Sequence, residues 1–552
     1  MPVSRRRFLG TSATVGAAVA VGTVPATPAR AARSAFSVNS TTTPPSFAMI
    51  ALNRMAYGPR PGDVQRVRTM GLPAYIEEQL APATIDDSAC DQRFAARNYK
   101  TLSLSRGELW TGYHKLPAWN DRLLPWREVR DATWVRAVYS KRQLQEVIVE
   151  FWHNHFNVHG TSSSDIACTW PDYDRTLRKH CFGNFRALLE DVAKSTAMLL
   201  FLDNASSRDG PSNENYAREL FELHTLGAEH YYNHLYDDVT HIPRYNDGRP
   251  MGYIDQDIYE AADCFTGWTM ANGAWNGDGH FPDTGDFLYH HAWHDDRPTK
   301  IVLSPNGQPN VRAGTTPMAD GRGVLDLLAK HPATAKHVCR KLCRRLVADE
   351  PPQALVDRAA QVWLDNIAAA DQIARVLRTI FTSPEFLHWG DKTKRPFEYV
   401  ASYLRVTNAE FTPGDHLFWS MGSTGYRLFE WPTPTGHPDT GDAWLNPNSL
   451  LRMWNFSTML FEGWFGVAAF ALQNEVPSNV TTSAQIVDYW LDRMLGRPVD
   501  AAHRTALIDF LRGSRGANEA PQPEPATNPD DLKARINNLI ALIAMMPEYL
   551  ER

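Results

Sequence analysis

The chain has 552 residues, of which 43% are hydrophobic and 21% charged, and its formal net charge is −6. The small negative charge argues against a nucleic-acid partner, because such proteins usually present a basic face. No segment is long and apolar enough to span a membrane, which takes about 20 strongly apolar residues. A large globular protein is therefore expected.

The N-terminal segment has the pattern of an export signal. Residues 4–10 (SRRRFLG) fit the twin-arginine motif, a mildly apolar stretch follows over residues 11–24, and residues 29–31 (ARA) offer a small-x-small cleavage site. We expect a signal peptide over residues 1–31 and a linker over 32–45. The translocation machinery would carry the folded protein to the cell envelope or the exterior, a route that suits proteins loaded with a cofactor inside the cell.

Helical periodicity dominates the remainder, so we predict a mainly α protein. It should be a single large helical domain over residues 46–552, with long loop insertions, little β structure and any sub-boundary near 390–395. Predicted loops cover residues 227–252, 272–317, 422–447 and 513–529. Predicted helices cover residues 46–55, 63–71, 73–80, 131–156, 183–202, 214–225, 255–266, 321–328, 332–347, 352–368, 371–382, 396–406, 449–473, 483–495 and 530–546.

Six cysteines allow two interpretations. Their even number permits disulfides in an exported protein, and Cys168 with Cys181 is the first pair to test. The alternative is that all six are buried free thiols.

The densest polar motif is the segment 150–159 (EFWHNHFNVH). Glu150 and His153 have the i, i+3 spacing that carboxylate-bridged metal sites use in helical bundles. One continuous helix cannot direct His153, His155 and His159 to one point, so a helix end near His155 is expected. The alternative is that these histidines lie under loops and bond to backbone carbonyls.

Two further motifs combine carboxylates with histidines. Over residues 213–224, Asn215, Glu219 and Glu222 share one helix face, while Arg218 is placed to pair with acidic neighbours. A salt-bridged helix surface is the alternative to a site here. The loop 290–296 (HHAWHDD) is dense enough in histidine and aspartate to bind a metal, or it is a solvated polar turn.

Several segments together resemble DUF1800, a family of bacterial proteins of unknown function. The matching segments are 51–58, 152–156, 202–204, 213–219, 222–227, 265–268, 294–295, 331–335, 383–386 and the Pro-x-Gly loop ahead of Trp444. The resemblance covers almost the whole chain and implies a large, helical, exported protein, but no settled activity. The sequence departs from the family pattern at residues 295–298 and in insertions around 231–253.

The leading hypothesis is a metal-dependent exported hydrolase or oxidoreductase of unknown substrate. Imidazole with carboxylate ligands suits zinc, iron or manganese, and such a metal would activate a bound water or oxygen. The expected roles are catalytic for Glu150, Glu219 and Glu222, substrate-binding for Asn154, Asn215, Arg218 and Trp268, and metal-ligating for His153, His155, His294 and Asp295.

Two alternatives need no metal. One is a carbohydrate-active hydrolase in which Glu150 and Glu219 form a catalytic pair, with tryptophans such as Trp275, Trp293 and Trp444 stacking on sugars. The other is a non-catalytic envelope or structural protein. In that protein the polar motif residues would bond to each other and to loop backbone.

Overall fold

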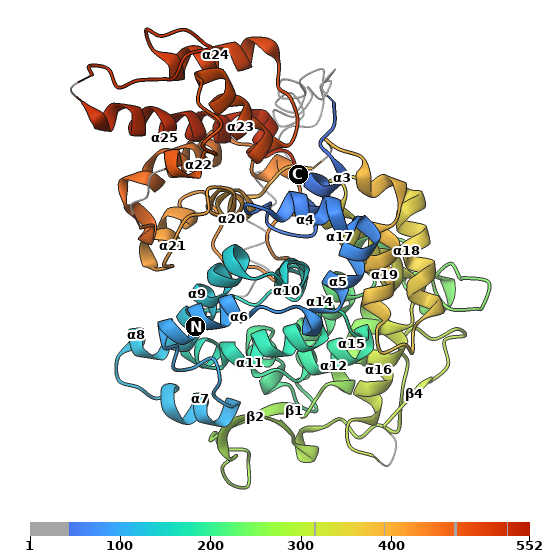
Figure 1. Ribbon diagram of the computed structural model, residues 1–552. Helices are drawn as coiled ribbons and strands as arrows, with labels where there is room; N and C mark the ends of the chain where they lie inside the picture. Colours follow the sequence, from blue (N-terminus) through green and yellow to red (C-terminus); the bar gives the residue numbers. More distant parts are fainter. Residues whose placement is uncertain (1–42, 314–315, 391, 469–471, 527) are drawn as a thin grey trace, which may run out of the picture.

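The computed structural model describes residues 43–313, 316–390, 392–468, 472–526 and 528–552. The predicted signal peptide and most of the predicted linker lie outside these residues. Helices dominate the described part of the chain (Figure 1), and the strands in it form two small antiparallel sheets. The mainly α prediction is therefore confirmed. One cluster of buried hydrophobic side chains extends from Ala48 to Leu550.

The first helices follow local sequence signals. Ser46 caps α3 (Phe47–Arg54) by accepting the N–H of Met49, and Gly71, at φ 82°, separates α4 (Asp63–Met70) from α5 (Leu72–Leu80). The following helices are α6 (Ser88–Arg97), α7 (Arg106–Tyr113) and α8 (Trp119–Arg122).

The expected single helix over 131–156 is instead two, α9 (Leu124–Tyr139) and α10 (Gln143–His155). Asp87 fixes the break by accepting hydrogen bonds from the Ser140 hydroxyl and the Lys141 N–H, both at 2.7 Å. The Gln143 side chain donates to the carbonyl oxygens that end α9. Side-chain bonds to the backbone thus outweigh helical periodicity here.

Helix α10 packs against α5, α9 and the helix over residues 164–180. The predicted helix 183–202 is split at Lys194 and Ser195 into α12 (Phe185–Ala193) and α13 (Thr196–Phe201). The other elements are α11 (Ser164–His180), α14 (Glu214–Glu219), α15 (Asp255–Cys264), α16 (Ala319–Ala329), α17 (Pro332–Leu346), α18 (Gln353–Asp365) and α19 (Gln372–Phe381), with strands β1 (Trp268–Asn272), β2 (Asp283–Tyr289), β3 (Thr299–Lys300) and β4 (Val311–Arg312).

The C-terminal helices form the red and orange part of Figure 1. The predicted helix 449–473 ends early, at Met459, and short turns follow in which Gly463 has φ 82°. The elements of this part are α20 (Pro396–Val406), α21 (Asp415–Gly422), α22 (Pro447–Met459), α23 (Ser483–Leu495), α24 (Ala501–Arg512), α25 (Pro529–Met545) and α26 (Pro547–Leu550).

Two global properties follow. None of the helices in the described part of the chain is long and apolar enough to cross a membrane. All six cysteines are buried free thiols, which is the second of the two interpretations, and Cys168 and Cys181 form no disulfide. The reason is geometric, because Cys168 lies inside α11 and Cys181 caps its end. Thirteen helical residues separate their Cα atoms by roughly 20 Å, far beyond disulfide reach.

Candidate functional site

The polar motif of residues 150–159 lies at the C-terminal half of α10. The helix ends at His155, as predicted, and Phe156 follows with ψ 55°. Asn157 holds the departing chain by donating to the carbonyl oxygens of Trp431 and Thr433 at 3.0 and 2.7 Å. Glu150, His153 and His155 consequently face three different surroundings.

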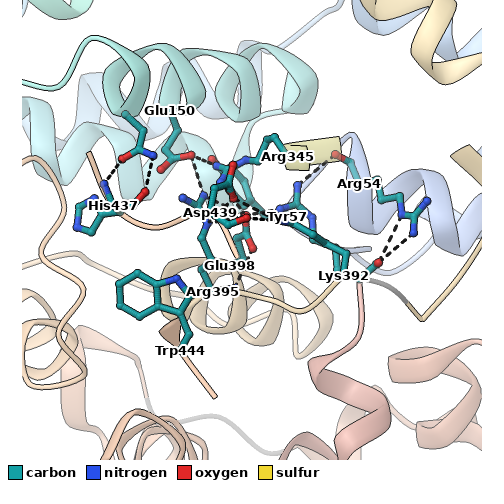
Figure 2. A network of polar contacts seen from close by, with 12 residues as sticks. Arg54, Tyr57, Glu150, Arg345, Lys392, Arg395, Glu398, His437, Asp439 and Trp444 are labelled. Carbon is teal, nitrogen blue, oxygen red and sulfur yellow. Dashed lines mark hydrogen bonds and ion pairs between the residues drawn. The ribbon is translucent and has the colours of Figure 1, made fainter. Parts of the chain in front are cut away.

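Glu150 lies in a buried charge network formed by Arg54, Glu150, Arg345, Lys392, Arg395, Glu398, Asp439 and Arg552 (Figure 2). Its carboxylate accepts from Arg395 Nη2 at 2.9 Å and from the Tyr426 hydroxyl at 2.8 Å, and it contacts Arg345. Two guanidinium groups and a hydroxyl therefore occupy both carboxylate oxygens. These contacts are typical of a buried carboxylate that stabilises the fold.

The same network includes Glu398. Burial raises the pKa of Glu398, but the guanidinium groups of Arg395 and Arg552 outweigh this effect and hold that pKa below its usual value. Lys392 joins Asp349 to Asp439, at 3.0 and 3.3 Å. The network thus links α10, α17 and α20 with the segments on either side of them.

Asn154 attaches α10 to the Pro-x-Gly loop. Its side chain donates to the carbonyl oxygen of His437 at 2.9 Å and accepts from the N–H of His437 at 2.6 Å. Gly436 is required there because a Cβ at this position would lie 2.2 Å from the Asn154 carbonyl oxygen. The His437 ring stacks on Tyr426, with centroids 4.1 Å apart.

His153 faces α11. Its Nε2 lies 3.0 Å from Asp174, which also accepts from Arg178 at 2.7 Å, and Arg178 pairs with both oxygens of Glu146. Burial lowers the pKa of His153, against the opposing effect of Asp174. The buried Nδ1 of His153 has no hydrogen-bond partner among the described residues. The ring borders a cavity of about 10 Å³, room for about one water.

His155 belongs to a second group, here called the His–Lys cluster: His155, His224, Glu229, His337 and Lys341. Nε2 of His155 lies 3.1 Å from the His224 carbonyl oxygen, and the His155 ring centroid is 6.1 Å from that of His224 and 6.5 Å from that of His337. His337 contacts the Leu223 carbonyl oxygen and Glu229. The cluster joins α10, α17 and the segment after α14.

Electrostatics within the cluster disfavour the cationic forms of His155, His224 and Lys341, whereas the pKa of Glu229 is lowered, which favours its charged form. Burial first, and Lys341 second, lower the pKa of His155 far below its usual value and that of His224 to about 3. Burial also lowers the pKa of Lys341 to about 8. The carboxylates of Asp439 and Glu229 act against this lowering of the Lys341 pKa. Within the described chain, His155 Nδ1 and His224 Nε2 are buried without hydrogen-bond partners.

The second motif forms α14 and then a π-helix, η3 (Leu220–His224), instead of one regular helix. π-Helical turns are rare in proteins, but those that occur are frequently found at functional sites. Arg218 pairs with Glu214, as expected of a helix-surface pair, and with Asp255, at 3.3 and 3.1 Å. Asn215 contacts Asp203 at 3.4 Å. Glu219 and Glu222 are half-buried along the same segment.

The third motif folds around a buried aspartate. His294 Nε2 lies 3.0 Å from Asp320 and its Nδ1 lies 2.9 Å from the Thr266 carbonyl oxygen. Burial lowers the pKa of His294, but Asp320 outweighs it and the net shift is upward. Asp295 pairs with Arg297 at 2.8 Å. Trp268 is fully buried, in contact with Phe265 and Phe287.

Comparison with known proteins identifies the family. The family model "Protein of unknown function (DUF1800)" matches residues 50–551. The chain belongs to DUF1800. No curated protein and no solved structure matches it.

In this DUF1800 protein the four expected metal ligands do not converge. His153, His155 and His294 each contact a different acceptor, and Asp295 contacts Arg297. In the described residues, no group of three or more histidine, cysteine, aspartate or glutamate side chains could hold a metal ion. The donor set therefore does not fit a metal centre.

The sequence did not lead to a prediction of the residues that α17 contributes to the His–Lys cluster. His337, Lys341 and Arg345 follow at intervals of four residues, so they share one helix face. They come directly after the family segment 331–335. This spacing of four residues is the sequence signal from which their shared position could have been predicted. The partner of His153, Asp174, lies on α11, a helix that the sequence analysis did not predict.

Proposed function

We propose that this DUF1800 protein is a hydrolase whose general base is Lys341 in the His–Lys cluster. The observation that carries the proposal is a lysine whose pKa burial lowers to about 8, in the same cluster as two buried imidazoles whose ring nitrogens have no partner among the described residues. A general base works best when its pKa lies near the operating pH. Perturbed pKa values of this kind gather at functional sites.

The neighbouring imidazole of His155 orients the attacking water. Because His155 Nε2 must donate to the His224 carbonyl oxygen, the neutral ring carries its lone pair on Nδ1. A water bound between Lys341 and His155 would donate one proton to each nitrogen. The Lys341 amine takes one proton as the water oxygen attacks the substrate, and the resulting ammonium returns that proton to the leaving group. The scissile bond breaks, and the elements of water are added across it.

We further propose export in the folded state by the twin-arginine pathway. The N-terminal pattern supports it. The six buried free thiols also support it, because a protein that folds in a reducing cytoplasm keeps its cysteines unpaired.

The experiment is site-resolved amine labelling of the mature protein as a function of pH, read by mass spectrometry. Lys341 should reach half-maximal labelling near pH 8. Lys336, on the same helix but 48% exposed, is the matched control and should label only at higher pH. Panels of chromogenic esters, amides and glycosides should then show an activity that K341M abolishes and K336M retains. The proposal fails if Lys341 labels like Lys336.

A second candidate is a non-catalytic envelope protein, favoured by how completely other motif residues are bonded. Asn154, Asn157 and His294 all contact loop backbone, and Glu150 is held by two arginines. This candidate predicts no hydrolysis of any substrate in these panels by the wild-type protein. A K341M-sensitive activity excludes it.

A further inference from the structure

The loop after the third motif contributes to a fully buried ion pair that the proposed function does not use. Lys300 Nζ lies 2.7 Å from Asp320 Oδ2, and both side chains are 0% exposed. Lys300 ends β3, and Asp320 lies in the first turn of α16. The ammonium also donates to the Asp295 carbonyl oxygen at 2.8 Å. The amine nitrogen and the carboxyl group are therefore held in contact, out of reach of solvent.

The two oxygens of Asp320 lie in different surroundings. Oδ2, which contacts the lysine, also lies 3.0 Å from His294 Nε2. Oδ1 accepts the Gly321 N–H at 2.8 Å. His294 Nδ1 lies 2.9 Å from the Thr266 carbonyl oxygen, so Nδ1 carries a proton and Nε2 is the nitrogen that exchanges one with Asp320. One carboxylate oxygen thus faces a backbone donor, and the other faces both an amine and a proton carrier.

These are the components that amide formation requires. An amine and a carboxyl group react far faster when they are held in contact than when they meet in solution. A backbone N–H on the retained oxygen stabilises the charge that develops there, and an imidazole transfers protons to the leaving oxygen. Gly321 and His294 occupy these two positions. Burial favours the product, because the reaction replaces two desolvated charges by a neutral amide.

We propose that Lys300 and Asp320 condense to an intramolecular isopeptide bond, with His294 as the proton carrier. The Lys300 amine attacks Asp320 Cγ, His294 Nε2 carries protons from the nitrogen to Oδ2, and Oδ2 departs as water. The Nζ–Cγ bond forms and the Cγ–Oδ2 bond breaks. One ammonium and one carboxylate thus become one neutral amide and one water, without any change of oxidation state.

The bond has a structural consequence for the loop that it closes. It joins β3 to the start of α16, so residues 300–320 become a covalent ring. Such a crosslink restricts the unfolded chain in the way that a disulfide does, in a protein whose six cysteines are free thiols. No residue of the His–Lys cluster takes part, and the inference does not rest on the proposed hydrolase.

The test is the mass of the full mature protein, followed by digestion after lysine. The protein should be lighter than its sequence requires by about 18 Da, one water. Under denaturing conditions the protease should leave residues 195–330 uncut at Lys300, with the same mass deficit in that fragment. Lys392 is the matched control: it is buried 3.0 Å from Asp349, but Asp439, at 3.3 Å, shares its ammonium. Two carboxylates keep it charged, so cleavage after Lys392 should be complete.

Two variants test the proton carrier. H294N removes Nε2 and should have the full mass that its sequence requires, with normal cleavage at Lys300. H291N is the matched control, because the His291 side chain in the same loop is 74% exposed, and it should keep the mass deficit. Circular dichroism establishes that both variants are folded. K341M should also keep the deficit, which separates this test from that of the hydrolase.

Three results would overturn the proposal. The first is a wild-type protein of full mass that is cut at Lys300. The second is a deficit of one water with Lys300 still cut, because the Gly321 nitrogen would then have closed on Asp320 as an imide in place of the lysine. The third is an unchanged deficit in folded H294N, which would remove His294 from the reaction.

Discussion

His155 donates its Nε2 proton to the carbonyl oxygen of His224, with 3.1 Å between the two atoms. The contact fastens the last residue of α10 to the last residue of the π-helix η3. It fixes the tautomer of His155, while burial lowers the pKa of both rings and keeps them uncharged. A buried neutral histidine makes the free energy of unfolding sensitive to acid, because the unfolded chain binds a proton that the folded chain does not bind.

We predict that this pair makes the protein labile to acid. The pKa of His224 is about 3 in the folded state, against about 6.5 in an unfolded chain. The free energy of unfolding should therefore fall as the pH drops from about 6.5 to about 3, by up to about 1.4 kcal/mol per pH unit for this residue. Chemical denaturation at pH 7, 6 and 5 measures it. H224N should flatten the slope, whereas H241N, at an exposed histidine, should leave it unchanged. An unchanged slope in H224N contradicts the prediction.

The proposed general base predicts a pH–rate profile of a particular sign. Only the unprotonated amine of Lys341 accepts a proton, so the hydrolytic rate should rise with pH and level off above about 8. K341R should lose at least a hundredfold in kcat, because arginine stays protonated at these pH values. Measurement of kcat across pH 6–9.5 checks both statements. A rate that falls on raising the pH, or an active K341R enzyme, would rule out this role.

Glu150 should contribute strongly to the free energy of unfolding. E150Q leaves Arg345 and Arg395 buried without one of their carboxylates, and breaking a buried pair costs about 3–5 kcal/mol. The exposed pair of Asp371 and Arg375 is the control, and D371N should cost at most about 1 kcal/mol. Urea denaturation compares the two variants. If E150Q is as stable as D371N, the charge network does not hold these helices together.

The sequence predicted the fold class and the end of α10, because helical periodicity and the motif over 150–159 are local signals. It did not predict which acceptor each motif histidine would find. Asp174 and Asp320 are distant in sequence from the histidines they contact, and only tertiary packing brings them together. Helix breaks set by distant side chains, such as Asp87 at Ser140, were missed for the same reason. Nothing in the sequence around Lys341 indicated its lowered pKa.

The contacts of Asn154 should hold the loop over residues 431–444 in place. N154A removes both hydrogen bonds to the His437 backbone, at a cost of about 1–3 kcal/mol. Limited proteolysis should then cut this loop faster than in the wild type, as peptide mapping would show. N448A removes one exposed contact, to the Ser423 carbonyl oxygen, and should not change the cleavage rate. Equal cleavage of all three proteins would mean that other contacts hold the loop.

The export proposal predicts that transport depends on the paired arginines. Translocation machinery reads the pair as an address, so replacing Arg5 and Arg6 by lysine preserves charge but removes the signal. The double variant should accumulate in the cytoplasm as the uncleaved, folded precursor, while the wild type appears outside as a mature chain shortened at about residue 31. Cell fractionation with mass determination distinguishes them. R7K, next to the pair, is the matched control and should be exported normally. Export of the double variant at the wild-type rate would show that another pathway carries the protein.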